Sequence, residues 1–181
     1  MKYIILLRGI NISGKNKISM SDLKSHLESN GYENVITYLN SGNIILESKE
    51  SNKNNITKSI NRLIKEKFNL EIPVFAISYI ELTDLINNAP SWWGNGNKEI
   101  YDNIIFILPP MESNEVKDVL GNLNESVEKV YEYNNAFFWS YELKSYRASY
   151  WWKKTASTYI KDSITIRTGN TMKKLLEICS K

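Results

Sequence analysis

The sequence of 181 residues contains one cysteine and one histidine, and these two shortages exclude whole classes of site. Because a disulfide needs two cysteines, Cys179 cannot form one within the chain, and a reducing compartment is expected. The lone histidine, His26, cannot build a three-histidine, Cys2His2 or facial-triad metal centre within one chain. We therefore predict no metal and no cofactor.

Long hydrophobic runs and a strong charge bias are also missing. The apolar run over residues 3–7 stops at Arg8, too short for a signal-peptide core or a transmembrane helix, so a cytoplasmic location without membrane association is expected. The formal net charge is only +3, from 23 basic and 20 acidic residues. Proteins that grip duplex DNA carry a much stronger basic bias, so nucleic acid is the less favoured partner.

The sequence does contain the material for a core and a repeated order of elements. Hydrophobic residues make up 42% and charged residues 24%, a balance that excludes disordered, collagen-like and coiled-coil chains. The first half predicts, in order, strand 2–8, a helix with its N-cap at Ser19, strands 35–39 and 44–46, a helix through 56–68 and strand 72–77. The second half predicts strand 103–108, helix 116–123, strands 127–133 and 136–141, helix 146–159 and strand 163–166.

Two β-α-β-β-α-β series predict an α+β fold, a tandem duplication of ferredoxin-like units with antiparallel sheets. We place the first unit at residues 1–78 and the second at 100–181, with a connector at 79–99 that holds a short helix and a Trp-Trp-Gly-Asn loop. The second unit ends in an extra C-terminal helix whose apolar face includes Met172 and Cys179. On this face Cys179 is expected to be an inert buried thiol.

The loop after the first strand, Arg8–Asn16, has the spacing of the phosphate-binding pattern G-x-x-x-x-G-K. Three features argue against a nucleoside triphosphatase: Asn16 replaces the Ser or Thr that holds magnesium, the next helix begins at Ser19 or later, and no later strand ends in a suitable Asp. An anion-binding nest is still compatible with the residues of this loop: Arg8, Asn11, Gly14, Lys15 and Asn16. The competing interpretation is a glycine-rich connector whose polar groups are simply solvated.

The predicted sheet brings a second loop to the same edge. The hairpin turn at residues 40–43 should lie beside the Arg8–Asn16 loop, because the third strand pairs with the first, and convergent polar loops are how binding sites are commonly built. We predict a site for a small anionic ligand, a nucleotide or phosphate ester, to which Ser41 and Asn43 contribute. Arg167 would join it only if the two halves pack edge to edge. No general base can be identified, so catalysis, if any, would depend on positioning and electrostatics.

Three segments carry a resemblance to a known family: Leu6–Asn16, Thr37–Asn43 and Thr165–Thr171. In order and spacing they resemble the bacterial domain-of-unknown-function 1697 family over essentially the whole chain, and the first segment is the most specific. In the last segment, Thr168-Gly169 stands where the family often has Asn-Trp. The resemblance implies the same fold and points to the same loops, but it implies no established activity.

An aromatic and basic segment gives an alternative function. Residues 146–154 interleave Tyr and Trp with Arg and Lys, as single-stranded nucleic-acid binders do, which predicts a nucleic-acid or protein interaction module using helix 146–160. In the competing interpretation, Trp151 lies at the margin of an amphipathic helix with Lys153, Lys154 and Lys161 solvated. The core stripe of that helix would be Ala148, Trp152, Ala156 and Tyr159.

The Trp92-Trp93 pair in the connector allows two interpretations. The pair is expected either to be buried at the seam between the halves or to contact a partner, including a second copy of the chain. The sequence does not choose between them, so the oligomeric state stays open.

Overall fold

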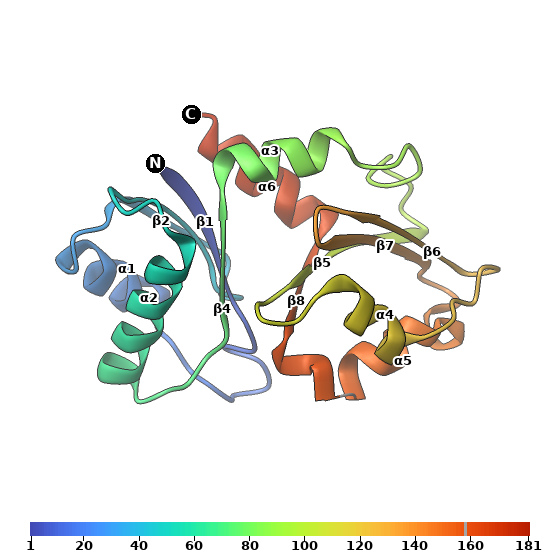
Figure 1. Cartoon of the computed structure of the whole chain (residues 1–181), viewed down its shortest axis with the longest axis horizontal. Helices are drawn as coiled ribbons and strands as arrows, with labels where there is room; N and C mark the ends of the chain where they lie inside the picture. The colour runs from blue at the N-terminus through green and yellow to red at the C-terminus, as the bar shows by residue number, and fades with distance from the viewer. Residues whose placement is uncertain (158) are drawn as a thin grey trace. The chain divides into compact units, whose positions relative to one another are not determined.

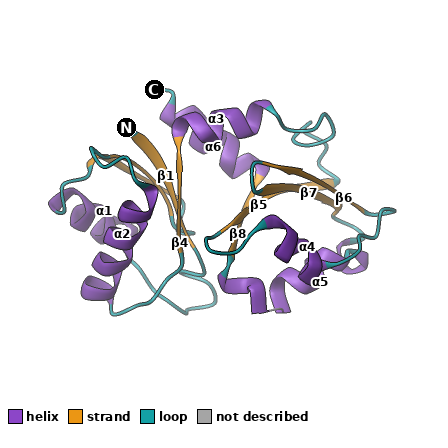
Figure 2. Ribbon diagram, in the orientation of Figure 1, coloured by secondary structure: helices purple, strands orange, loops and turns teal. Residues whose placement is uncertain are grey.

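The computed structural model describes residues 1–157 and 159–181, without the side chains of residues 156, 157 and 159. Its strands are β1 (Lys2–Leu7), β2 (Glu33–Tyr38), β3 (Asn43–Glu47), β4 (Val74–Ser78), β5 (Ile100–Ile107), β6 (Glu128–Tyr133), β7 (Ala136–Glu142) and β8 (Ile164–Thr168). Its α-helices are α1 (Met20–Ser29), α2 (Lys53–Phe68), α3 (Tyr79–Asn87), α4 (Ser113–Leu120), α5 (Tyr150–Ser157) and α6 (Gly169–Cys179). Single 3-10 turns are η1 (Tyr146–Ala148) and η2 (Tyr159–Asp162), and Figure 2 distinguishes helices, strands and loops by colour.

Within the described residues, the strands form two four-stranded sheets in which all neighbours are antiparallel. The orders are β2-β3-β1-β4 and β6-β7-β5-β8, so the first strand of each series lies between the third and the fourth. This is the order of a split β-α-β unit, and helices α1 and α2 cover the first sheet as α4 and α5 cover the second (Figure 1). The predicted α+β duplication with an extra C-terminal helix is confirmed.

The chain divides into two compact units: the first is Met1–Thr83 together with Leu175–Lys181, and the second is Asp84–Lys174. This division differs from the boundaries expected from sequence, which assigned all of residues 100–181 to the second half. The last segment belongs to the first unit because Cys179 is buried and its carbonyl accepts a hydrogen bond from Lys2 Nζ of β1 at 2.6 Å.

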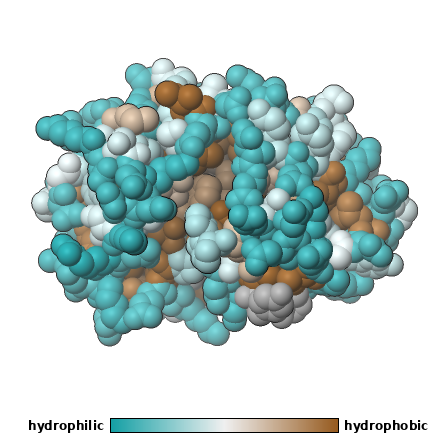
Figure 3. Space-filling model, in the orientation of Figure 1, coloured by the Kyte–Doolittle hydropathy of each residue, from teal (hydrophilic) through white to brown (hydrophobic). Residues whose placement is uncertain are grey.

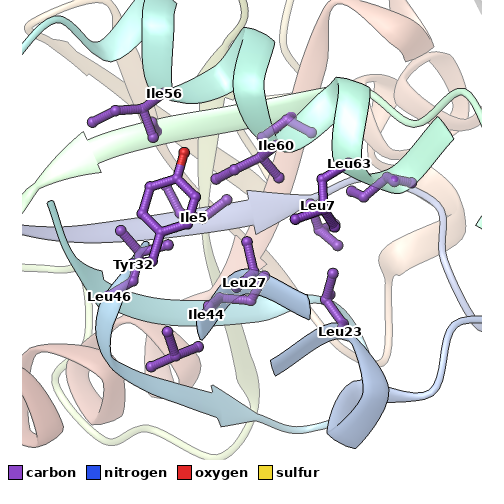
Figure 4. Close-up of a cluster of buried hydrophobic side chains, with 14 of the residues drawn as sticks. Ile5, Leu7, Leu23, Leu27, Tyr32, Ile44, Leu46, Ile56, Ile60 and Leu63 are labelled. Carbon is purple, nitrogen blue, oxygen red and sulfur yellow. The ribbon is translucent and has the colours of Figure 1, made fainter. Parts of the chain in front are cut away.

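The core of the first unit forms between one face of the sheet and the apolar faces of two helices. Alternate residues of β1 and β3 point to the helices, and Figure 4 shows them meeting side chains from α1 and α2: Ile5, Leu7, Ile44, Leu46, Leu23, Leu27, Ile56, Ile60 and Leu63. Helix α1 starts where the sequence predicts, since Ser19 Oγ accepts a hydrogen bond from Asp22 N at 3.3 Å. The outer face of α2 is charged, with Arg62 and Glu66 exposed, and Figure 3 shows hydrophilic side chains over it.

The core of the second unit includes Trp151, which is 2% exposed and packs edge-on against Phe137 with ring centroids 5.4 Å apart. Trp152 is 37% exposed. The sequence predicted the reverse, with Trp152 in the core stripe and Trp151 at its margin, and that prediction is wrong. The predicted core positions Ala156 and Tyr159 lie outside the side chains that the structure describes.

The cause of this reversal is a break at Ser149 in the helix predicted over 146–159. Ser149 is extended (φ −65°, ψ 126°), and its Oγ accepts a hydrogen bond from Trp152 N at 3.0 Å, so it caps a new helix. The same hydroxyl donates to Glu128 Oε2 at 2.5 Å, and Glu128 Oε1 accepts from Tyr150 N at 2.9 Å. The side chain of Glu128 thus anchors the start of α5 and sets which tryptophan faces the core.

Candidate functional site

The Arg8–Asn16 loop is folded back on itself by residues with positive φ, namely Gly9, Asn11, Ser13, Gly14 and Asn16. The backbone N–H of Asn11 donates to Asn16 O at 3.2 Å, and that of Lys15 donates to Ile12 O at 2.9 Å. Helix α1 does not begin until Met20, so Lys15 does not lie on its first turn. The loop is therefore a self-contained turn rather than a phosphate-binding loop of the triphosphatase kind.

The amides of Asn11 and Asn16 hold this loop together. Asn11 Nδ2 donates to Ile18 O and to Asn40 O, both at 2.9 Å, while Asn11 Oδ1 accepts from Ile18 N at 2.9 Å. Asn16 Nδ2 donates to Gly9 O at 3.0 Å. These two predicted ligand-binding residues thus position backbone: Asn11 uses both side-chain N–H groups and its oxygen and has little capacity left for a ligand, whereas Asn16 uses one N–H group.

The hairpin turn meets the loop as the sequence predicts. The backbone N–H of Leu7 donates to Gly42 O at 2.8 Å, and Asn40 O accepts from the side chain of Asn11. Asn43 is fully buried, and its Nδ2 donates to Tyr38 O and to Ser41 Oγ, both at 3.0 Å. Asn43 therefore shapes the turn, while Ser41 is exposed beside it.

Positive charge gathers at these two segments, which we call the loop edge (residues 8–19 and 38–43). The loop edge contains Arg8, Lys15 and Lys17 and no Asp or Glu. Arg8 is half-buried, whereas Lys15 and Lys17 are exposed and form no ion pair with any residue that the structure describes. Lys15 and Lys17 therefore contribute positive charge that no acidic side chain of the described residues pairs with.

Arg167, the remaining predicted site residue, lies on β8 of the second unit. Its Nη1 donates to Thr165 Oγ1 at 3.0 Å and to Ile166 O at 2.9 Å. These contacts hold the guanidinium against its own strand, and they give Arg167 a role within the second sheet.

A pocket of about 370 Å³ opens in the second unit, on the face of the sheet that carries α5. It is lined by residues of β5, β7, β8 and α5, and we call it the aromatic pocket. Its lining residues are Tyr101, Asn103, Trp139, Tyr141, Trp152, Thr155, Ile166 and Thr168. Pockets of 300–1,000 Å³ with aromatic walls and a few polar groups are typical sites for small molecules.

Fixed rings form the walls of the aromatic pocket. The ring of Tyr141 lies 5.5 Å from that of Tyr101 and 4.9 Å from that of Trp139, and Trp139 Nε1 donates to the buried carboxylate of Glu128 at 3.2 Å. Trp152 packs edge-on against Tyr146, with ring centroids 4.7 Å apart. The aromatic side chains are thus held in place without any ligand.

Sequence reasoning missed this pocket, although a signal was present. Residues 101, 103, 105 and 107 alternate onto one face of β5, and the aliphatic pattern of Ile105 and Ile107 changes there to Tyr101 and Asn103. A polar residue in a predicted buried face marks either a hydrogen-bonded core site or a ligand site.

The other tryptophan pair has a structural role. Trp93 is 5% exposed, packs edge-on against Phe138 with centroids 5.1 Å apart, and donates from Nε1 to Asn103 O at 2.9 Å. These contacts cover the sheet face opposite α5 within the second unit. Only Trp92 of the pair is partly exposed and accessible to a partner.

Burial raises the pKa of the Tyr141 hydroxyl from 10.0 to about 12, with Tyr101 acting in the same direction. Because the unfolded chain loses this proton at lower pH than the folded one, stability should fall as pH rises from about 10 to 12. We expect Tyr141→Phe to remove about 1 kcal/mol of this fall, since solvent screening reduces the full effect of the shift. Urea unfolding at a series of alkaline pH values measures the free energy of unfolding of both proteins. If this free energy falls equally with pH in the wild-type protein and in Tyr141→Phe, the prediction is wrong.

The described residues also lack a membrane-spanning helix and a cluster of metal ligands. No helix there is both long enough and apolar enough to cross a membrane. In the same residues, no group of three or more His, Cys, Asp or Glu side chains is placed to hold a metal ion.

Comparison with known proteins supports the fold. The family model "Protein of unknown function (DUF1697)" matches residues 1–138. Among solved structures, the conserved bacterial protein SP0830 from Streptococcus pneumoniae is similar over 97% of each chain, with a TM-score of 0.86 and 26% sequence identity. No match is found among the curated proteins. Neither description names a ligand or an activity.

Proposed function

The chain belongs to the DUF1697 family of proteins of unknown function, and we propose that it binds a small anionic ligand, a nucleotide or phosphate ester, at the loop edge. The observation that carries this proposal is the 2.9 Å hydrogen bond from Asn11 Nδ2 to Asn40 O, which ties the loop to the hairpin turn. The proposal rests on a rigid junction of two segments that together hold three cationic side chains and no acid.

The roles of the individual residues follow from their contacts. Arg8 and Lys15 supply positive charge, and Ser41 contributes an exposed polar side chain at the turn. Asn11 and Asn43 act indirectly: they do not bind the ligand but fix the backbone of the loop and of the turn. Because this backbone is fixed before binding, little ordering entropy is lost when the anion arrives.

The test is calorimetric titration of the full chain with inorganic phosphate, nucleoside monophosphates and sugar phosphates. We expect the double variant Arg8→Ala/Lys15→Ala to weaken binding about tenfold or more, since a hydrogen bond to a charged group contributes ~1.5–3 kcal/mol. Binding by the wild-type protein should also weaken as salt is added.

A matched double variant controls for the loss of charge. Lys58→Ala/Arg62→Ala removes one Lys and one Arg from exposed positions on α2 and leaves the loop edge intact. It should bind as the wild-type protein does. Affinity that survives Arg8→Ala/Lys15→Ala, or that falls equally in both double variants, would refute the loop edge as the site.

A second candidate function is an interaction module for single-stranded nucleic acid at α5, favoured by the exposure of its aromatic residues. Tyr150 is 46% and Trp152 is 37% exposed, and Arg147 and Lys153 beside them are exposed as well. This candidate predicts oligonucleotide binding that falls steeply with salt, is lost in Trp152→Ala and is unaffected by Arg8→Ala. Trp151→Ala is not a suitable test, because Trp151 is a core residue.

A further inference from the structure

We infer that the aromatic pocket of the second unit is a further binding site, for an uncharged heterocycle of the nucleobase class, free or as its nucleoside. This inference is independent of the loop edge, because it concerns other residues in the other unit. It stands on the polar atoms inside the pocket, on the rings around them and on the lack of charge in the lining.

Asn103 is the central observation. Its side chain is 2% exposed, lines the pocket and donates one hydrogen bond, from Nδ2 to Tyr101 O at 3.1 Å. Since a carbonyl can only accept, this contact fixes which end of the amide is nitrogen. Among the residues that the structure describes, Asn103 Oδ1 accepts no hydrogen bond, and the second N–H has no acceptor. A buried amide that is half-unpaired is rare and calls for a partner.

A second polar atom in the pocket is also unpaired. The hydroxyl of Tyr141, a residue that is 7% exposed, makes no hydrogen bond with any described residue. A ligand in the pocket would therefore meet an amide oxygen, an amide N–H and a phenol hydroxyl. Purine and pyrimidine edges present donors and acceptors side by side, and an asparagine amide can pair with two of them at once.

The walls select for a flat ring. Tyr101 and Trp152 are each 37% exposed, whereas Trp139 and Tyr141 are buried deeper. Aromatic faces bind bases by stacking, and this interaction accepts any base because every base has a π face. Specificity among the bases then depends on hydrogen bonds to the side chain of Asn103.

The lining also limits the charge and size of the ligand. No residue of the described lining is ionic at neutral pH, so a phosphate inside the pocket would lose its water without gaining a counter-charge. A volume of about 370 Å³ is at the small end of the range for ligand sites. Both observations favour a base or nucleoside over a nucleotide.

The experiment is titration of the full chain with adenine, adenosine, uridine and guanosine, with ribose as the control compound. Indole N–H resonances in ¹⁵N spectra report the site, since Trp152→Phe identifies the Trp152 signal. We expect at least one base or nucleoside to bind saturably and to shift the Trp152 resonance while that of Trp92 stays in place. Ribose should not bind.

Three variants locate the site. Trp152→Ala should weaken binding about tenfold or more through lost stacking, and Asn103→Leu should weaken it and reduce discrimination among bases. Tyr131→Ala, on β6 and exposed but outside the lining, should leave the dissociation constant unchanged. If Asn103→Leu fails to fold, the exposed Trp152 still provides the test.

Several results would overturn the inference. They are no saturable binding of any base or nucleoside up to its solubility limit, equal affinity in the wild-type protein and Trp152→Ala, or binding of ribose alone. Loss of nucleoside binding in Arg8→Ala/Lys15→Ala would overturn it in favour of the loop edge. Binding of oligonucleotides alone, with steep salt dependence, would overturn it in favour of the interaction module.

Discussion

Glu128→Ala is expected to destabilise the second unit by about 4 kcal/mol, because it leaves buried donors without an acceptor. Glu128 is 2% exposed and accepts hydrogen bonds from the backbone N–H groups of Asn124 and Tyr150, both at 2.9 Å. It also accepts from Trp139 Nε1 at 3.2 Å and from Ser149 Oγ at 2.5 Å. These donors come from separate segments, so removal of the carboxylate weakens both β7 and the start of α5.

Tryptophan fluorescence measures this effect selectively. All five tryptophans lie between residues 92 and 152, inside the second unit, so urea unfolding followed at this signal reports that unit. Glu125→Ala, an exposed neighbour, is the control and should change stability by less than about 0.5 kcal/mol. Glu128→Gln should fall between the two, because an amide keeps one acceptor oxygen and places an NH2 group against the other donors. Equal midpoints for Glu128→Ala and the wild-type protein would contradict the argument.

Gly42→Ala is expected to destabilise the first unit by about 3 kcal/mol, from steric overlap and a strained backbone together. Gly42 has φ +80°, and a Cβ there would lie 2.6 Å from Leu7 Cβ and 3.0 Å from Ile10 Cδ1. Leu7 is fully buried in the core, so it cannot move aside without disturbing β1. The substitution therefore disrupts the junction between the loop and the hairpin turn on which the proposed anion site depends.

Gly14→Ala is the matched control for Gly42→Ala. Gly14 has nearly the same φ, +77°, but a Cβ there would meet nothing within 4 Å. Its cost should be the backbone strain alone, about 1 kcal/mol. Hydrogen exchange of the amides of β1 and β3 measures both variants in the first unit. If the two substitutions lower protection equally, packing at Leu7 is not the cause.

Local signals in the sequence were enough to predict most of the fold. The cap at Ser19 and the turn between β2 and β3 are set by neighbouring residues, and the sheet order follows from the series of elements. The break at Ser149 was not predicted, because its cause is Glu128, a residue of β6 that is distant in the sequence. The helical periodicity of apolar residues continues through Ser149, so it cannot reveal a contact that ends one helical turn and starts a new helix.

Prediction of the candidate sites reached a similar limit. Topology predicted that the loop and the hairpin turn meet, and they do. It could not predict that the side-chain amides of Asn11 and Asn43 would donate to backbone carbonyls. These hydrogen bonds depend on turns with positive φ that bring the carbonyls within reach. Asn103 was overlooked because a single polar residue in an apolar strand usually finds a partner within the core.

Helix α6 has a consequence for how a nascent chain matures on the ribosome. Leu175–Lys181 completes the first unit, yet translation reaches it only after all of Asp84–Lys174. At about 5–20 residues per second, that delay lasts roughly 5–20 s. During this time the surface of the first unit that later buries Cys179 stays uncovered. The unit that is begun first is thus completed last.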